Sequence, residues 1–239
     1  MKSNRVPVWT FLTLPVALGV MLAAPSFSPA ADAPKPDAPK ADAPKTDTPK
    51  TEAPKKEVSA VEFIDALSKQ VIGLLGNKKL ALPERRKRIQ DVAYANIDFT
   101  TLSRLAVGPL WQRMSGTQRK DFMTEFRVHL ANTYRSMIDN YNDEQVKVVS
   151  DRDEGRGDHT VLTKVIDPKN GDETKVDYRV RKTPEGWRVI DITIEGISLA
   201  ANFRSQIQEI GDPDRLIKMV HEKNVAAESD SGPTTQPGK

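Results

Sequence analysis

The sequence predicts an α+β domain in which helices precede and follow a four-stranded antiparallel meander sheet. Apolar residues recur at helical spacing between positions 61 and 141, alternate with polar residues between 146 and 194, and return to helical spacing after Gly196. Short glycine-containing loops separate the alternating segments, which favours hairpins between neighbouring strands. Helices gathered on one face of a curved sheet would enclose an apolar cavity in a cone-shaped fold. This cavity is the first candidate for a functional site.

Two helices are expected at the start of the domain. An apolar stripe runs from Val61 to Leu75, and Gly76 is a natural stop after it. Pro83 suits the first turn of a second helix, because an N–H there would have no partner in the helix. The basic run of residues 85–88 belongs to this helix. We interpret the run as a solvated face, with contact to an anionic membrane or an acidic partner as the alternative.

A short and a long helix are expected next. Asp98 is placed to cap the short one, and Gly108 followed by proline ends it. Ser115 and Gln118 have the spacing of a capping box, so they predict the start of the long helix. Its stripe of large apolar side chains continues to about Tyr141. We therefore expect one uninterrupted helix, in which the stripe of large side chains spans about five turns.

The meander is expected to begin at Val146 and to end at Ile194. Alternation and turn residues place its second and third strands at Thr160–Ile166 and Thr174–Lys182. The loops that connect the four strands are predicted at residues 153–157, 167–171 and 183–186.

The last strand leads directly into another helix. Leu199, Phe203 and Ile207 follow Gly196 at helical spacing, and a break at residues 211–213 separates this helix from a final one. A strand that continues into a helix lying across its own sheet would form a concave apolar wall.

The N-terminus has the features of a cleaved export signal. Lys2 and Arg5 precede an apolar run from Val6 to Ala24, and Ala30 fits the last position before a cleavage site. An uncleaved membrane anchor is the alternative, although this run is marginal for a span of about 20 residues. We expect the mature chain to be exported.

The composition divides the chain into four segments. An Asp-Ala-Pro-Lys unit recurs with period five from Asp32, and its prolines prevent a helix. We interpret this repeat as an extended spacer, with a tether as the alternative. The expected segments are a signal peptide at 1–30, a disordered repeat linker at 31–56, a domain at 57–226 and a disordered polar tail at 227–239.

Charge and cysteine content argue against several classes of protein. The formal net charge is +3, and loss of Lys2 and Arg5 with the signal would leave a nearly neutral chain. Aromatic and basic residues do not interleave as in a nucleic-acid platform, so we expect no nucleic-acid partner. The absence of cysteine excludes disulfides and lipid attachment through an N-terminal cysteine.

No catalytic or metal-ligating constellation stands out. His129, His159 and His221 are not at metal-ligand spacing, and the chain has no P-loop, Gly-x-Ser-x-Gly elbow or cysteine nucleophile. Asp191 lies in an apolar strand and is a candidate buried base of a cone-shaped enzyme. The interpretation we favour pairs it with Arg188 or another donor. We expect no enzymatic activity, no metal and no cofactor.

The candidate binding site is an apolar wall shared by the long helix, the sheet and the following helix. Arg204 is a candidate contact for a phosphate head group, with an ion pair to Glu195 or Glu209 as the alternative. The predicted lining residues are Phe122, Phe126, Leu130, Tyr134, Val165, Tyr178, Val180, Ile190, Ile192, Ile194, Leu199, Phe203 and Ile207.

A gapless series of short motifs runs through the domain from about Val61 to Ile217. The motifs are Asp98-Phe99, Leu102-Ser103-Arg104, residues 108–111, Gln118-Arg119, Phe122 through Phe126, Tyr134, Val176-Asp177-Tyr178, Gly186-Trp187-Arg188, Asp191, residues 195–199 and residues 202–205. In these motifs the chain resembles the MlaC family of periplasmic phospholipid-binding proteins, also called the toluene-tolerance family. It departs from the family pattern at Leu110 and Phe203, where tyrosine is usual, and at Gly116, where proline is frequent.

The resemblance implies an NTF2-like cone that carries a phospholipid as cargo in the periplasm. It also implies two partners, an outer-membrane lipoprotein complex and an inner-membrane ABC-type transport complex, and a role in outer-membrane lipid asymmetry. Burial of an acyl chain would contribute about 0.8 kcal/mol per CH₂ group. Two alternatives stay open: a hopanoid-associated lipid-binding protein of the same family, and a structural adaptor whose core is filled.

Overall fold

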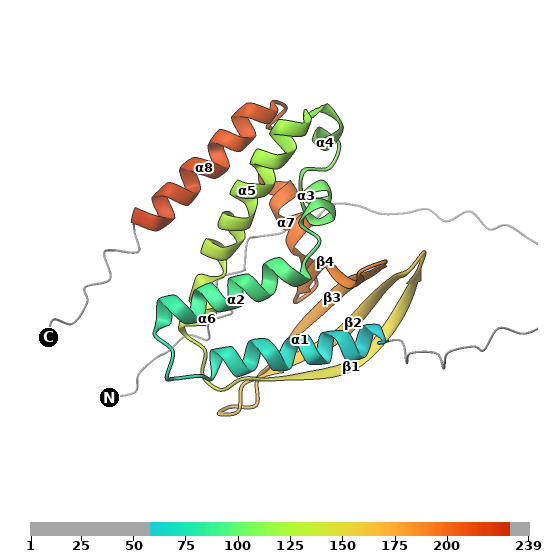
Figure 1. Ribbon diagram of the computed structural model, residues 1–239, viewed down its shortest axis with the longest axis vertical. Helices are drawn as coiled ribbons and strands as arrows, with labels where there is room; N and C mark the ends of the chain where they lie inside the picture. The colour runs from blue at the N-terminus through green and yellow to red at the C-terminus, as the bar shows by residue number, and fades with distance from the viewer. Residues whose placement is uncertain (1–57, 230–239) are drawn as a thin grey trace, which may run out of the picture. The chain divides into compact units, whose positions relative to one another are not determined.

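The computed structural model describes residues 58–229, in which six helices precede an antiparallel sheet and two follow it (Figure 1). The expected signal peptide and the repeat linker lie outside the described residues, as does most of the expected tail. The helices are α1 (Ala60–Leu75), α2 (Leu82–Asn96), α3 (Phe99–Val107), α4 (Leu110–Arg113), α5 (Gly116–Thr133), α6 (Arg135–Asp139), α7 (Leu199–Gln206) and α8 (Pro213–Ser229). The strands are β1 (Gln145–Gly155), β2 (Asp158–Ile166), β3 (Glu173–Thr183), β4 (Gly186–Ile194) and β5 (Ile197–Ser198).

Side-chain caps mark the starts of α3 and α5, as the sequence predicts. The Asp98 carboxylate accepts a hydrogen bond from the Thr101 backbone N–H at 2.9 Å and so caps α3. Ser115 and Gln118 form the predicted reciprocal capping box of α5. A second capping box, between Ser59 and Glu62, starts α1. These contacts join residues that are close in sequence, so such caps can be predicted without knowledge of the fold.

The long helix predicted to reach Tyr141 is interrupted, which corrects that expectation. α5 ends at Thr133, Tyr134 has φ −101° and ψ 9°, and the short helix α6 follows. The Thr133 hydroxyl donates to the carbonyl of His129 at 2.8 Å, and this type of back-bonding often bends helices. At the other end of the chain, α8 continues to Ser229, beyond the domain boundary predicted after residue 226.

The sheet has five strands in the order β1-β2-β3-β4-β5, all antiparallel, instead of the predicted four. β5 has only two residues and pairs with β4 across Glu195 and Gly196, both of which have positive φ. A two-residue strand is too short to alternate, so the sequence offers no periodic signal for it. β1 is also longer than predicted, because its hairpin with β2 turns at Arg156 and Gly157.

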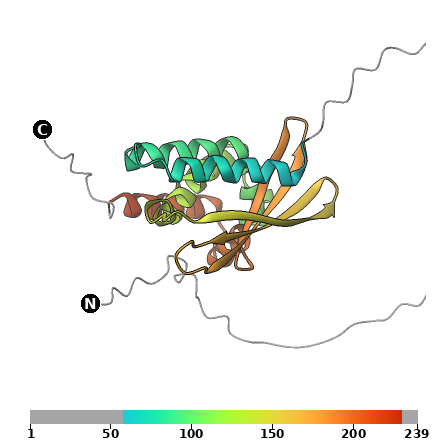
Figure 2. The same cartoon turned by 90° about the horizontal axis from the view of Figure 1, so that it is seen from below.

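Helix α1 covers one face of the sheet, which we call the inner face. It packs along β1 and β2, with α2 beside it (Figures 1 and 2). Val161, Val180 and Val189 from three neighbouring strands pack there with Ala60 and Ile64 of α1. α7 packs on β4 and α3, and α8 packs along α5. None of the helices that the structure describes is long and apolar enough to span a membrane.

Candidate functional site

Most of the buried apolar residues form two clusters. The helical cluster belongs to α3, α4, α5, α7 and α8, and the sheet cluster belongs to α1 and the inner face of the sheet. Ile97 packs against both and forms a backbone bridge to Val189 of β4. Among the described elements, no closely packed pair joins α5 or α6 to a strand. The helical cluster contacts the sheet where α3 and α7 pack on β4.

Half-buried side chains lie at the edges of the two clusters, and we call this set the seam. Leu130 packs at the edge of the helical cluster, whereas Leu67, Val148, Tyr178 and Ile192 pack at the edge of the sheet cluster. Tyr134, which follows α5, is also half-buried. Such side chains combine apolar surface with access from outside, and this is what an apolar ligand requires. The enclosed cavity stays a prediction, and the seam is where it would lie.

Four predicted lining residues lie inside the helical cluster and not at its edge. Phe122 and Phe126 are fully buried, and Phe203 and Ile207 are 4% exposed. The ring of Phe126 lies 5.2 Å from that of Phe122 and 4.6 Å from that of Phe203, measured between centroids. These rings fill the space between α5 and α7, so this contact surface is already used within the protein. Sequence period alone does not distinguish such a filled core from a ligand wall.

The predicted lining residues Tyr178 and Val180 of β3 share one face of the sheet with part of the sheet cluster. Val180 is fully buried in that cluster, and Tyr178 lies between Val161 of β2 and Ile192 of β4. Val165 is half-buried and pairs with Thr174 of β3. Pleating places directly opposed residues on the same face. The inner face thus presents Tyr178, Ile192 and Val165 without complete burial.

The predicted alternation of Ile190, Ile192 and Ile194 is interrupted by a β-bulge. Arg179 pairs with Asp191, but Val180 pairs with Val189, so Ile190 is an extra residue. Ile190, Ile194 and Leu199 are buried and belong to neither cluster. The bulge also brings Val189 into the sheet cluster, which the simple alternation missed. Leu67 was missed as well, although its place on the first helical stripe was a usable signal.

Tyr134 and Tyr178 lie deep in the protein and yet keep their hydroxyls accessible. Burial raises the pKa of Tyr178 to about 12. Burial, with a smaller contribution from the Asp191 carboxylate, raises the pKa of Tyr134 to about 12. Neither hydroxyl has a hydrogen-bond partner among the described residues, and neither is sealed from solvent. Both phenols are therefore protonated donors without a protein acceptor.

Asp191 connects the end of the sheet to α7. Its carboxylate accepts hydrogen bonds from the Ser198 hydroxyl and, at 3.3 Å, from the Ala200 backbone N–H. Ser198 is in turn the N-cap of α7, accepting from the Ala201 N–H at 3.0 Å. A carboxylate at a helix N-terminus also meets the positive end of the helix dipole. These contacts give Asp191 a structural role and remove the reason for assigning it as a buried base.

Arg204 also makes structural contacts, which does not support its assignment as a head-group contact. Its guanidinium donates to the backbone carbonyl of Leu105 from Nε at 2.9 Å and from a second nitrogen. The side chain lies against Gly108, where an added Cβ would come within 3.4 Å of it. Gly108 also has φ 59°, so its lack of a side chain serves both the turn and this close approach. Arg204 therefore joins α7 to the end of α3.

The other charged candidates are engaged within the protein. Arg86 forms a two-bond ion pair with Asp139 of α6 at 2.7 and 2.6 Å, so part of the basic run on α2 is structural. Burial lowers the pKa of His129, whose ring lies 5.6 Å from that of Phe203. His159 and His221 lie beside Asp151 and Glu125, respectively. No group of residues in the described part of the chain could hold a metal ion.

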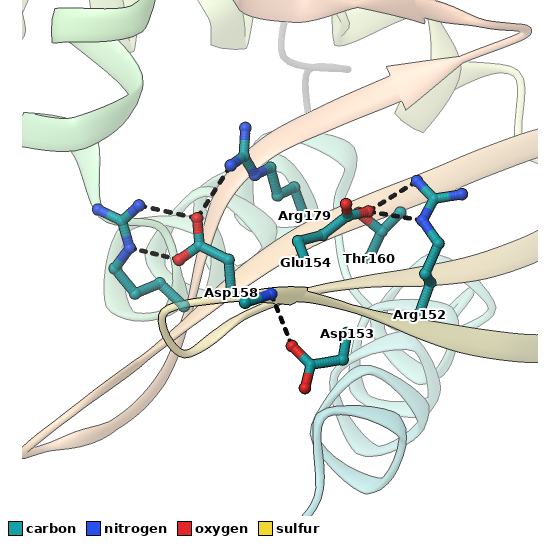
Figure 3. A network of polar contacts seen from close by, with 8 residues as sticks. Arg152, Asp153, Glu154, Asp158, Thr160 and Arg179 are labelled. Atoms are coloured by element: carbon teal, nitrogen blue, oxygen red, sulfur yellow. Dashed lines mark hydrogen bonds and ion pairs between the residues drawn. The ribbon is translucent and has the colours of Figure 1, made fainter. Parts of the chain in front are cut away.

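A polar network occupies the opposite, outer face of the sheet at the β1–β2 hairpin (Figure 3). Asp158 is buried and accepts from Arg181 at 2.6 and 2.8 Å and from Arg179 at 3.0 Å. Glu154 accepts from the Thr160 hydroxyl at 2.7 Å and from Arg152. The Arg181 hydrogen bond, opposed by burial, lowers the pKa of Asp158. The network holds the hairpin to β3 on the face away from the seam.

Comparison with known proteins agrees with this architecture. The sequence profile of the family described as MlaC protein matches residues 65–222. The structure of a phospholipid-binding protein from Ralstonia solanacearum, solved in complex with a phospholipid, is similar with a TM-score of 0.60 and 24% sequence identity. The similarity covers 72% of this chain and 99% of that chain, so the two share a fold. No curated protein matches the chain in sequence.

Proposed function

The chain belongs to the MlaC family, and we propose that it is a carrier that holds a phospholipid by its acyl chains. The Ralstonia solanacearum protein of the same fold binds a phospholipid, which supports a phospholipid as the cargo of this chain. The observation that carries the proposal is the division of the apolar residues into two clusters with a half-buried seam. We place the acyl chains along this seam.

The physical chemistry of the seam suits an acyl chain. Its helical and sheet sides offer apolar side chains, among them Leu130, Val148 and Ile192, that are not fully covered by the protein itself. Covering them with a chain would contribute about 0.8 kcal/mol for each buried CH₂ group. Affinity of this kind is not directional, so no set of charged residues is needed to hold the chains. This accords with the engagement of Arg86, Arg204 and Asp158 elsewhere in the fold.

We further propose that the protein works in the periplasm and passes lipid between an outer-membrane lipoprotein complex and an inner-membrane ABC-type complex. The export features of residues 1–30 and the family membership support this placement. In this role the protein would help to maintain the lipid asymmetry of the outer membrane. Release would require a partner that competes for the acyl chains or separates the two layers.

Native mass spectrometry of the full chain, purified without detergent, tests the binding proposal. We expect a population heavier than the apoprotein by one phospholipid mass, and lipid extraction should identify that lipid. Protein stripped of lipid and incubated with phosphatidylethanolamine and phosphatidylglycerol vesicles should regain it. A chain that is lipid-free after purification and takes up nothing from either vesicle would contradict the proposed function.

A further inference from the structure

The four tyrosines of the chain differ in what their hydroxyls contact. Tyr141 donates to the carbonyl of Glu144 at 3.2 Å. Tyr94 lies on the surface of α2, 37% exposed, with its ring edge-on to Phe99. Tyr134 and Tyr178 belong to the half-buried seam, and neither of their hydroxyls has a hydrogen-bond partner among the described residues. The last two are the unusual ones.

An unpaired hydroxyl in apolar surroundings needs an explanation. Buried tyrosines usually find a hydrogen-bond partner, because an unmet donor costs free energy once water is removed. The Asp191 carboxylate, which contributes to the raised pKa of Tyr134, accepts from the Ser198 hydroxyl and from two backbone N–H groups. Tyr178 has the apolar Val161 and Ile192 as its opposed neighbours on either strand. No described residue accepts from either hydroxyl, so both are free to donate to a ligand that enters the seam.

We propose that Tyr134 and Tyr178 donate hydrogen bonds to the ester carbonyl oxygens of a bound diacyl phospholipid. The inference rests on the proposed function and adds a chemical preference to it. An ester carbonyl is the first acceptor that follows an acyl chain, and an ester has no donor of its own, so it requires a donor from the protein. The neutral phenols of the two tyrosines supply that donor and no competing charge.

This arrangement gives the protein a way to recognise lipid class without reading the head group. A dialkyl ether lipid has the same chains and head group but lacks both carbonyls. When such a lipid occupies the seam, the two hydroxyls stay unpaired, and binding weakens because their desolvation is not compensated. The structure thus predicts selectivity for ester-linked over ether-linked phospholipids of equal chain length.

A competition experiment on the full chain separates this inference from lipid binding itself. A fluorescently labelled diacyl phospholipid is displaced by two water-soluble short-chain phosphatidylcholines of equal length, one a diester and the other a diether. Each hydroxyl should favour the diester about fivefold, which corresponds to about 1 kcal/mol. Tyr134→Phe and Tyr178→Phe should each reduce the diester-to-diether affinity ratio about fivefold. Tyr94→Phe is the matched control and should leave the ratio at its wild-type value.

The outcomes distinguish the two proposals. Binding of both lipids with equal affinity by the wild type would overturn ester recognition and leave lipid binding in place. A diester-to-diether affinity ratio that is unchanged in both Tyr134→Phe and Tyr178→Phe would also overturn ester recognition. Binding of neither lipid by the wild type would overturn the proposed function and this inference with it. The wild-type comparison needs no variant, so it is decisive even if one substitution impairs folding.

Discussion

Replacing Phe126 with alanine tests whether the helical cluster is a filled core. Phe126 is fully buried, and its ring contacts those of Phe122 and Phe203. Truncation removes both ring contacts and leaves a cavity between α5 and α7. Phe→Ala substitutions at such sites reduce the free energy of unfolding by about 3–5 kcal/mol. In a domain of this size each kcal/mol lowers the melting temperature by about 2–4 °C, so we expect a decrease of roughly 10 °C.

The same variant separates stability from lipid binding. Because Phe126 belongs to the closed cluster and not to the seam, the folded fraction of Phe126→Ala should bind the labelled diacyl phospholipid with wild-type affinity. Urea unfolding followed by circular dichroism measures the stability, and lipid titration well below the melting temperature measures the affinity. Phe126→Leu, which retains most of the apolar volume, serves as the milder companion variant.

Two results would refute this reasoning. A loss of stability below about 1 kcal/mol would mean that the ring does not fill a packed core, since such a cost is typical of partly exposed sites. A folded Phe126→Ala protein with tenfold weaker lipid binding would mean that the ring lines the acyl-chain site, as sequence period alone suggested. Unchanged affinity together with a large loss of stability supports the division into core and seam.

Three further predictions concern other parts of the fold. Ile192→Glu places a carboxylate on the seam and should weaken lipid binding at least tenfold in a titration, whereas Ile197→Glu on the exposed β5 should not change it. Asp158→Asn should flatten the pH dependence of stability. Arg181 lowers the folded-state pKa of Asp158 below the ordinary 3.8, so the carboxylate stabilises the fold above pH 3.8 and this contribution is lost as the pH falls further. The urea midpoints of the wild type and the variant should therefore converge in acid. Asp98→Ala removes the cap of α3 and should lower the free energy of unfolding by about 1 kcal/mol in the same assay, and an unchanged midpoint would contradict the capping assignment.

What the sequence predicts well is what depends on neighbouring residues. The caps at Asp98 and Ser115 and the turn at Gly186 follow from residues within a few positions of one another, and the structure confirms them. The alternation along β3 also predicts correctly that Tyr178 and Val180 share a face with part of the sheet cluster. In each case the physical cause lies within one element or between adjacent ones.

The failures arise where a distant contact or a single irregular residue decides the outcome. The extra residue Ile190 shifts the register between β3 and β4, and no composition rule specifies where a bulge falls. The break at Tyr134 follows a Thr133 hydroxyl that donates to the backbone carbonyl of His129, and no periodic pattern reveals such a bond. Phe126 and Tyr178 belong to different clusters because of the way the helices pack against the sheet. The spacing of apolar residues along the sequence contains no information about this packing.

A divided core has a consequence for the proposed function, in which the protein would both hold and release a lipid. If acyl chains completed one continuous core, their removal would expose the interior and threaten the fold. Here the helical cluster is closed by its own aromatic rings, and the sheet cluster is closed by α1, so each layer retains buried apolar residues without a ligand. A ligand in the seam would stabilise the folded state by RT ln(1 + [L]/Kd) without being required for folding. Under the proposed function, release of a lipid to a competing partner would therefore leave the protein folded.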